Sequence, residues 1–197
     1  MARFSQSAAL GFRVKSGWAV AVLLAGPVGS PHVLDRRVIQ LCDPTIPGSK
    51  QPHHASMGTL QTDEPKVERL RKLIAKAALG SVTEMMKDYK SEGHQLRRAT
   101  LVVGSDIDPA KISNPHIRAH ALEGRLFRTV LQDALRSCGL ECSVIVERNA
   151  YKQAAGGLKR SEPELKQLLK QLGHSVEGRW SADEKLAALA AWLALVS

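Results

Sequence analysis

The chain has 197 residues, of which 44% are hydrophobic and 24% charged, and its formal net charge is +9. This length is enough to bury a core, and we expect residues 1–197 to form one globular domain. The three cysteines are too few for a disulfide scaffold, so we expect free thiols in a cytoplasmic protein. The excess of positive charge favours a polyanionic partner such as nucleic acid.

The first part of the chain is predicted to form strands. Residues 10–24, most of which are apolar, predict one long strand, and residues 33–41 predict its partner across a turn rich in Gly and Pro. The apolar run 19–24 resembles a signal peptide, but it is too short to span a bilayer. We interpret it as a buried strand of a protein without membrane contact. Residues 43–61 are predicted to form a flexible loop, in which residues 53–55 could add a short strand.

Helices and strands alternate in the rest of the chain. Helices are predicted from residue 62 or 63 to 93 and from 114 to about 138, with strands at 99–103 and 142–146. Two capping boxes begin two further helices, Ser161-Glu162-Pro163-Glu164 and Ser181-Ala182-Asp183-Glu184. The last helix is apolar on most sides, so we expect it to be buried. This order predicts an α/β fold in which a mixed sheet begins with a hairpin meander and carries helices on both faces.

The order of elements resembles the ribonuclease H-like superfamily, and most closely the RuvC-type Holliday-junction resolvases and their YqgF-like relatives. Three stretches carry the resemblance: residues 10–20 (LGFRVKSGWAV), 147–156 (ERNAYKQAAG) and 182–189 (ADEKLAAL). In those resolvases a strand leads into a glycine-containing turn, a lysine-bearing segment precedes a helix, and an acidic, alanine-rich helix closes the domain. The resemblance implies binding of nucleic acid, either duplex or branched DNA or RNA.

The resemblance also implies two-metal phosphodiester hydrolysis, in which carboxylates hold two Mg²⁺ ions. The family's first carboxylate belongs on the first strand, where this chain has Arg13, a cation that would repel Mg²⁺. We therefore expect weak, altered or absent metal-dependent nuclease activity. For any activity that remains, we expect Glu123, Asp106 and Asp183 to be the catalytic residues, with Mg²⁺ or Mn²⁺ as the metal.

The sharpest local pattern is His116-x3-His120-x2-Glu123, because these offsets place three side chains on one face of a helix. Two imidazoles and a carboxylate are suitable ligands for Zn²⁺ or a similar divalent metal. The alternative is a pair of surface or capping histidines beside a glutamate that hydrogen-bonds to the backbone. His53 and His54 could supply a further ligand, but we interpret them as ordinary loop residues.

Basic and polar residues supply the candidate phosphate contacts, and these are Arg13, Lys15, Ser16, Lys152, Lys159 and Arg160. No aromatic residues are interleaved with them for base stacking, so we expect contacts to the nucleic-acid backbone with little sequence readout. The alternative function is that of a catalytically inactive pseudoenzyme. It would serve as a protein-interaction or scaffold module, with the apolar C-terminal helix exposed to a protein partner.

Overall fold

The computed structural model describes residues 7–55 and 58–196. The strands are β1 (Ala8–Lys15), β2 (Trp18–Ala25), β3 (His32–Gln40), β4 (Arg98–Val103) and β5 (Glu141–Val146). The α-helices are α1 (Glu64–Ser91), α2 (Pro115–Ser137), α3 (Ala150–Leu158), α4 (Glu162–Leu172) and α5 (Ala182–Val196). The described residues also form the short 3-10 helices η2 (Pro109–Lys111), η3 (Glu147–Asn149) and η4 (Gly173–Ser175).

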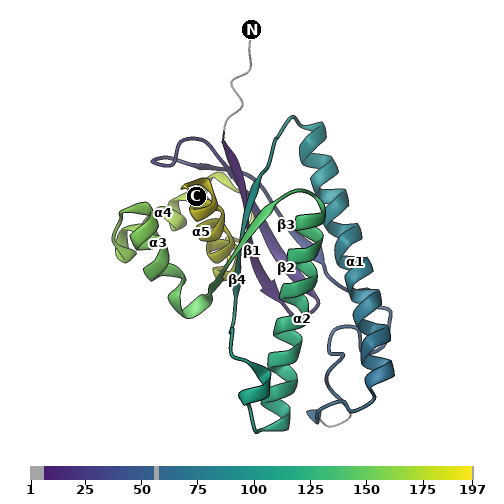
Figure 1. Ribbon diagram of the computed structural model, residues 1–197. Helices are drawn as coiled ribbons and strands as arrows, with labels where there is room; N and C mark the ends of the chain where they lie inside the picture. The colour runs from purple at the N-terminus through teal and green to yellow at the C-terminus, as the bar shows by residue number, and fades with distance from the viewer. Residues whose placement is uncertain (1–6, 56–57, 197) are drawn as a thin grey trace.

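The strands form one mixed sheet in the order β3-β2-β1-β4-β5. Strands β1, β2 and β3 form an antiparallel meander, whereas β4 and β5 run parallel to β1. Figure 1 shows α1 and α2 on one side of this sheet and α3, α4 and α5 on the other. The α/β fold with a mixed sheet and helices on both faces is therefore confirmed.

The prediction of one long strand over residues 10–24 was wrong, because a tight turn divides this segment into β1 and β2. Lys15 pairs directly with Trp18, so that only Ser16 and Gly17 form the loop. Gly17 adopts a φ of 86°, in the left-handed region that favours glycine. The Ser-Gly dipeptide is a recognised turn signal, but the strand-forming residues on both sides of it predicted an uninterrupted strand.

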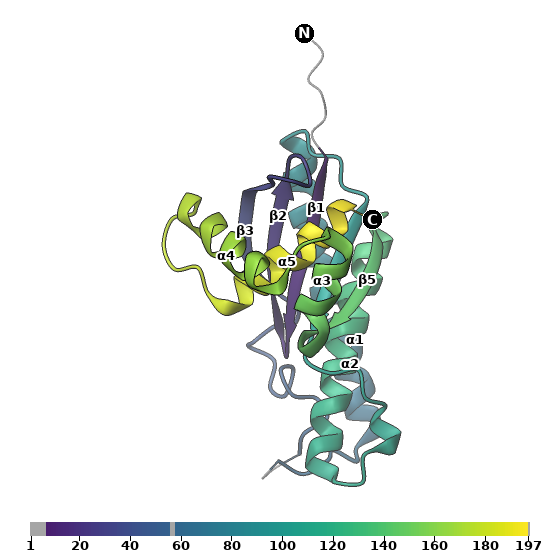
Figure 2. The ribbon, with the colours of Figure 1, turned by 90° about the vertical axis from the view of Figure 1, so that its left-hand side faces the viewer.

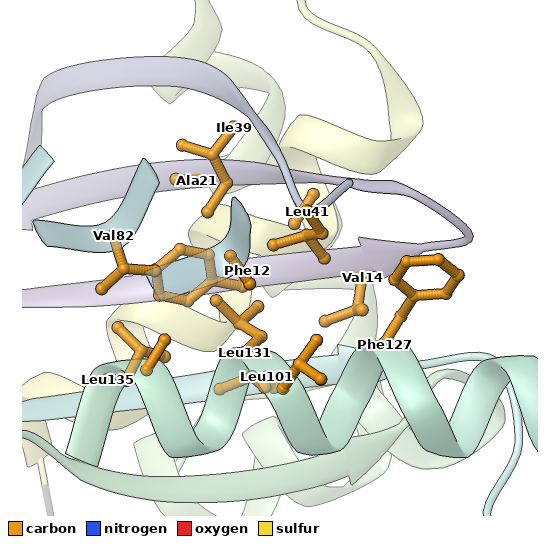
Figure 3. Close-up of a cluster of buried hydrophobic side chains, with 14 of the residues drawn as sticks. Phe12, Val14, Ala21, Ile39, Leu41, Val82, Leu101, Phe127, Leu131 and Leu135 are labelled. Atoms are coloured by element: carbon orange, nitrogen blue, oxygen red, sulfur yellow. The ribbon is translucent and has the colours of Figure 1, made fainter. Parts of the chain in front are cut away.

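One core lies between the sheet and the helices α1 and α2. Leu10, Phe12 and Val14 point to this face from alternate positions of β1, as the two-residue period of a strand requires. Figure 3 shows Phe12 beside Val82 of α1, with Leu131 of α2 below it. Side chains from the sheet and from both helices thus close this face.

A second core covers the opposite face, where α5 crosses the sheet (Figure 2). Helix α5 packs so closely on β1 that a Cβ at Gly11 would lie 2.0 Å from the Ala187 carbonyl oxygen. The expectation that the closing helix is buried is confirmed, since its residues from Leu186 to Trp192 are buried. The same burial contradicts the expectation that this helix is exposed to a protein partner, whereas the scaffold function itself stays a prediction.

Two further differences concern local structure. Residues 53–55 form no strand; His54 makes only an isolated antiparallel bridge to Leu60. Helix α3 was not predicted, because its sequence AYKQAAGGL contains two glycines and begins without a side-chain cap.

The cysteines Cys42, Cys138 and Cys142 are free thiols. Among the described residues, no helix is both long and apolar enough to cross a membrane.

Candidate nucleic-acid interface and histidine cluster

A cleft of about 360 Å³ opens where β1 and β4 end. Parallel strands β1, β4 and β5 present their carboxyl ends at this edge, which is where open α/β sheets bind ligands. One wall carries Arg13, Lys15 and Ser16 from the end of β1 and its turn. The opposite wall belongs to α2 and includes His120 and Phe127. Residues from the candidate phosphate contacts and from the histidine pattern therefore line one cavity.

Arg13 lies buried in the floor of this region and is 5% exposed. Its Nη1 donates to the carbonyl oxygen of Val14 at 3.0 Å, and its Nη2 donates to Glu147. Its Nε lies 3.6 Å from Asp183 Oδ1. The same oxygen forms an ion pair with Lys15, whose Nζ lies 3.0 Å away. The network therefore contains two cations and two carboxylates, and each charge has an opposite partner. Glu147 was not predicted as a site residue, although it directly follows the strand β5.

The acidic residues that follow β4 are also in ion pairs. Arg128 of α2 contacts Asp106, and the Arg125 Nη2 lies 3.0 Å from an oxygen of Asp108. The backbone N–H of Ala110 and the Arg125 guanidinium hold the pKa of Asp108 below its usual value. These carboxylates therefore anchor the loop after β4 to α2.

The histidines form a cluster that joins α2 to the loop of residues 43–61. The Nε2 atoms of His116 and His120 lie 3.2 Å apart. His54 is the third member, and one ring nitrogen from each of the three residues lies within 4.8 Å of the other two. The sequence pattern correctly brought His116 and His120 together, whereas the structure places His54 in the third position, where Glu123 was expected.

Glu123 lies behind this cluster and is completely buried. Its Oε1 is 2.6 Å from His54 Nδ1. Burial raises the pKa of Glu123, and the hydrogen bond with His54 acts in the opposite direction. Burial and the neighbouring rings of His54 and His116 lower the pKa of His120. The environment therefore favours the neutral form of His120, which is the form that binds metal ions.

The expected catalytic residues have separate partners. Asp106 contacts Arg128, Asp183 contacts Arg13 and Lys15, and Glu123 contacts His54. Within residues 7–55 and 58–196, the three carboxylates do not form a cluster with the spacing of metal ligands; His54, His116 and His120 do.

The remaining candidate phosphate contacts lie at two ends of α3. Lys152 is exposed in the first turn, next to the sheet edge where β5 ends. Lys159 caps the other end in the left-handed conformation, roughly 10 Å further along the helix axis than Lys152 at 1.5 Å per residue. Arg160 contacts Glu164 and donates to the Gly29 carbonyl oxygen at 3.2 Å. Of these three, only Lys152 lies at the end of α3 that follows β5.

Comparison with known proteins gives a structural relationship and no sequence relationship. No protein-family model matches the chain, and no curated protein matches it in sequence. The structure of Thermus thermophilus RuvC in complex with a Holliday junction substrate covers 94% of this chain and 90% of its own, with a TM-score of 0.57 and 10% identity. A second Thermus thermophilus RuvC structure covers 94% and 92%, with a TM-score of 0.56 and 10% identity. The yeast mitochondrial Holliday junction resolvase Ydc2 covers 94% and 78%, with a TM-score of 0.48 and 9% identity.

The similarity to the two RuvC structures, together with the mixed sheet, shows that the chain has a ribonuclease H-like fold of the RuvC type.

The charged network at the cleft does not fit the paired Mg²⁺ ions that a ribonuclease H-like fold implies. Mg²⁺ requires oxygen ligands, and a two-metal site requires carboxylates that are free to bind both ions. Here the buried Arg13 guanidinium occupies the centre of the network, and Asp183 and Glu147 compensate its charge. A magnesium pair would have to displace these contacts beside a buried cation.

Proposed function

We propose that this protein binds duplex or branched nucleic acid at the sheet edge through phosphate contacts, and that this edge does not act as a two-metal nuclease. The observation that carries the proposal is the set of cations at the carboxyl ends of the parallel strands. Lys15 ends β1, and Arg148 and Lys152 follow β5. Arg148 and Lys152 are exposed, and no acidic side chain in the described part of the chain pairs with either. Such cations are available for phosphate.

Two further observations support this function. The net charge of +9 favours the approach of a polyanion and its association at low salt. The RuvC structure of similar fold is a complex with a Holliday junction substrate. The Arg13 network supports the second half of the proposal, because a compensated buried cation stands where the resolvases are expected to have their first carboxylate.

The test is the salt dependence of binding to a fluorescently labelled four-way DNA junction and to a duplex of the same sequence. The two unpaired cations, Arg148 and Lys152, predict a fall in affinity of about 12-fold between about 50 and 200 mM salt. The variant Lys152→Ala should weaken binding and reduce the salt slope by roughly one contact. Lys76→Ala is the matched control, because Lys76 is an exposed cation on α1, across the sheet from α3. It should leave the affinity unchanged.

Cleavage is measured in the same samples with Mg²⁺ or Mn²⁺ added. We expect the junction to remain intact. No binding at low salt, or equal losses in the Lys152→Ala and Lys76→Ala variants, would contradict binding at this edge. Cleavage that the Asp183→Asn variant abolishes would contradict the proposed absence of two-metal chemistry.

A further inference from the structure

We propose that His54, His116 and His120 form a binding site for one divalent cation of the zinc class, with the fourth coordination position open to solvent. The site is distinct from the Arg13 network, and its existence does not depend on nucleic-acid binding. Its ligands come from two segments that are far apart in the sequence. His54 lies in the loop of residues 43–61, whereas His116 and His120 lie one turn apart at the start of α2.

The spacing of the ring nitrogens fits a tetrahedral cation. Zinc binds imidazole nitrogen at about 2.0–2.1 Å, so two ligands at a tetrahedral angle have nitrogens about 3.3 Å apart. The Nε2 atoms of His116 and His120 are 3.2 Å apart. The third ligand nitrogen, from His54, completes a group within 4.8 Å. A small inward movement of the His54 ring would bring its nitrogen to the same distance.

Two of the three rings are already oriented with a lone pair toward the centre. The Nδ1 of His116 lies 2.7 Å from the Gly58 carbonyl oxygen, which can only accept a hydrogen bond. His116 therefore donates from Nδ1, and in the neutral ring its Nε2 carries the lone pair. As a carboxylate, Glu123 imposes the same tautomer on His54 through Nδ1. A carboxylate or carbonyl behind each imidazole is the usual outer shell of a metal site.

One unsatisfied atom is the strongest sign that the cluster is a ligand set. The His54 side chain is 7% exposed, and its Nε2 is buried without a hydrogen-bond partner. The rings pack edge to face, with centroids 4.5 to 5.4 Å apart, but this packing leaves the His54 lone pair without a donor. A buried polar atom without a partner costs free energy. A cation between the three nitrogens would satisfy it.

The surroundings also select the type of cation. Imidazole ligands suit zinc and similar transition metals, whereas Mg²⁺ and Ca²⁺ require oxygen. Three protein ligands leave the fourth position for water or another oxygen ligand, as in zinc sites that remain open. His116 and His120 are exposed, so solvent reaches this position. Because His120 also lines the cleft, the cation would add positive charge at the rim of that cavity.

The test uses the full chain without nucleic acid. After removal of metal with a chelator, Zn²⁺ is titrated calorimetrically, and Co²⁺ is added as a spectroscopic probe of coordination. We expect one Zn²⁺ per chain and the intense visible absorption of tetrahedral Co²⁺. His120→Ala removes an exposed ligand and should lower the Zn²⁺ affinity by at least about 100-fold, more than the 10- to 100-fold typical of a lost outer-shell partner. Glu123→Gln removes the charge behind His54 and should lower the affinity by roughly tenfold.

His174→Ala is the control, because His174 is an exposed histidine on η4 and lies outside the cluster. Its Zn²⁺ affinity should equal that of the parent chain. Circular dichroism establishes that each variant is folded, and His116→Ala provides a second exposed-ligand variant. The proposal is overturned if the folded parent chain binds no Zn²⁺, if His120→Ala and His116→Ala bind as the parent does, or if Co²⁺ gives only the weak spectrum of an octahedral ion. Each of these results is independent of whether the chain binds DNA.

Discussion

Arg13 is a buried cation whose charge is compensated by carboxylates from two different elements. Glu147 comes from η3 and Asp183 from α5, while Arg13 itself lies on the central strand β1. The network therefore ties the middle of the sheet to its edge and to the helix that covers it. Removing one carboxylate leaves the guanidinium partly uncompensated in a buried position, which costs more than the loss of a surface ion pair.

The substitution Glu147→Gln tests this difference. We expect it to lower the free energy of unfolding by about 1–3 kcal/mol, because the Arg13 side chain is only 6% exposed. Glu164→Gln is a matched control, since Glu147 and Glu164 are 44% and 45% exposed and each contacts one arginine. The Arg160 pair lies at the surface, so its loss should cost less than about 1 kcal/mol. Urea denaturation measures both values, and equal losses would contradict a structural role for the Arg13 network.

Sequence spacing could predict only the part of the histidine cluster that lies on one helix. His116 and His120 are four residues apart, and a helix brings such residues together regardless of the rest of the fold. The contact of His54 with Glu123 joins residues 69 positions apart. It depends on how the loop of residues 43–61 packs against α2, which no local pattern encodes.

At the scale of elements, the contact between α5 and β1 depends on a missing side chain. A Cβ at Gly11 would lie 2.0 Å from the Ala187 carbonyl oxygen and 2.2 Å from the Ala191 nitrogen. Both atoms belong to the backbone of α5, so the whole helix would have to move away from the sheet. The alanines of α5 are small for the same reason, because they allow its backbone to approach the strand.

We therefore expect Gly11→Ala to lower the free energy of unfolding by about 1–3 kcal/mol, as overpacking of a core does. Gly80→Ala is the control, because a Cβ at Gly80 of α1 would contact no atom within 4 Å. It should raise stability by roughly 0.5–1 kcal/mol, since alanine is the better helix former. Thermal unfolding of both variants measures the two effects. A neutral or stabilising Gly11→Ala would mean that α5 does not pack against β1 as described.

The elements that sequence could predict are those with a strong local pattern. The capping residues Ser161 and Ser181 accept hydrogen bonds from backbone N–H groups of the helices they begin, as expected. Helix α3 contains two glycines and has no side-chain cap. Its buried residues Ala150, Ala154 and Leu158 pack into the core beneath α5. Tertiary contacts therefore stabilise a helix that intrinsic propensity does not favour.

For the whole molecule, one sheet separates two cores, and the optical probes of the chain are divided between them. Trp18, Trp180 and Trp192 all belong to or pack against the core beneath α3, α4 and α5. The two longest helices, α1 and α2, cover the other face and dominate the helical circular dichroism. Tryptophan fluorescence and far-ultraviolet dichroism therefore report mainly on opposite faces of the sheet.

If residues 1–197 fold as one domain, both signals should change at the same urea concentration, because the two cores share the strands β2 and β4. Val20 and Val22 of β2 belong to the core under α5, whereas Ala19 and Ala21 of the same strand belong to the core under α1 and α2. Loss of either core exposes strands that the other requires, so unfolding should be cooperative. Two separated transitions, with fluorescence changing first or last, would show instead that α3, α4 and α5 unfold as an independent unit.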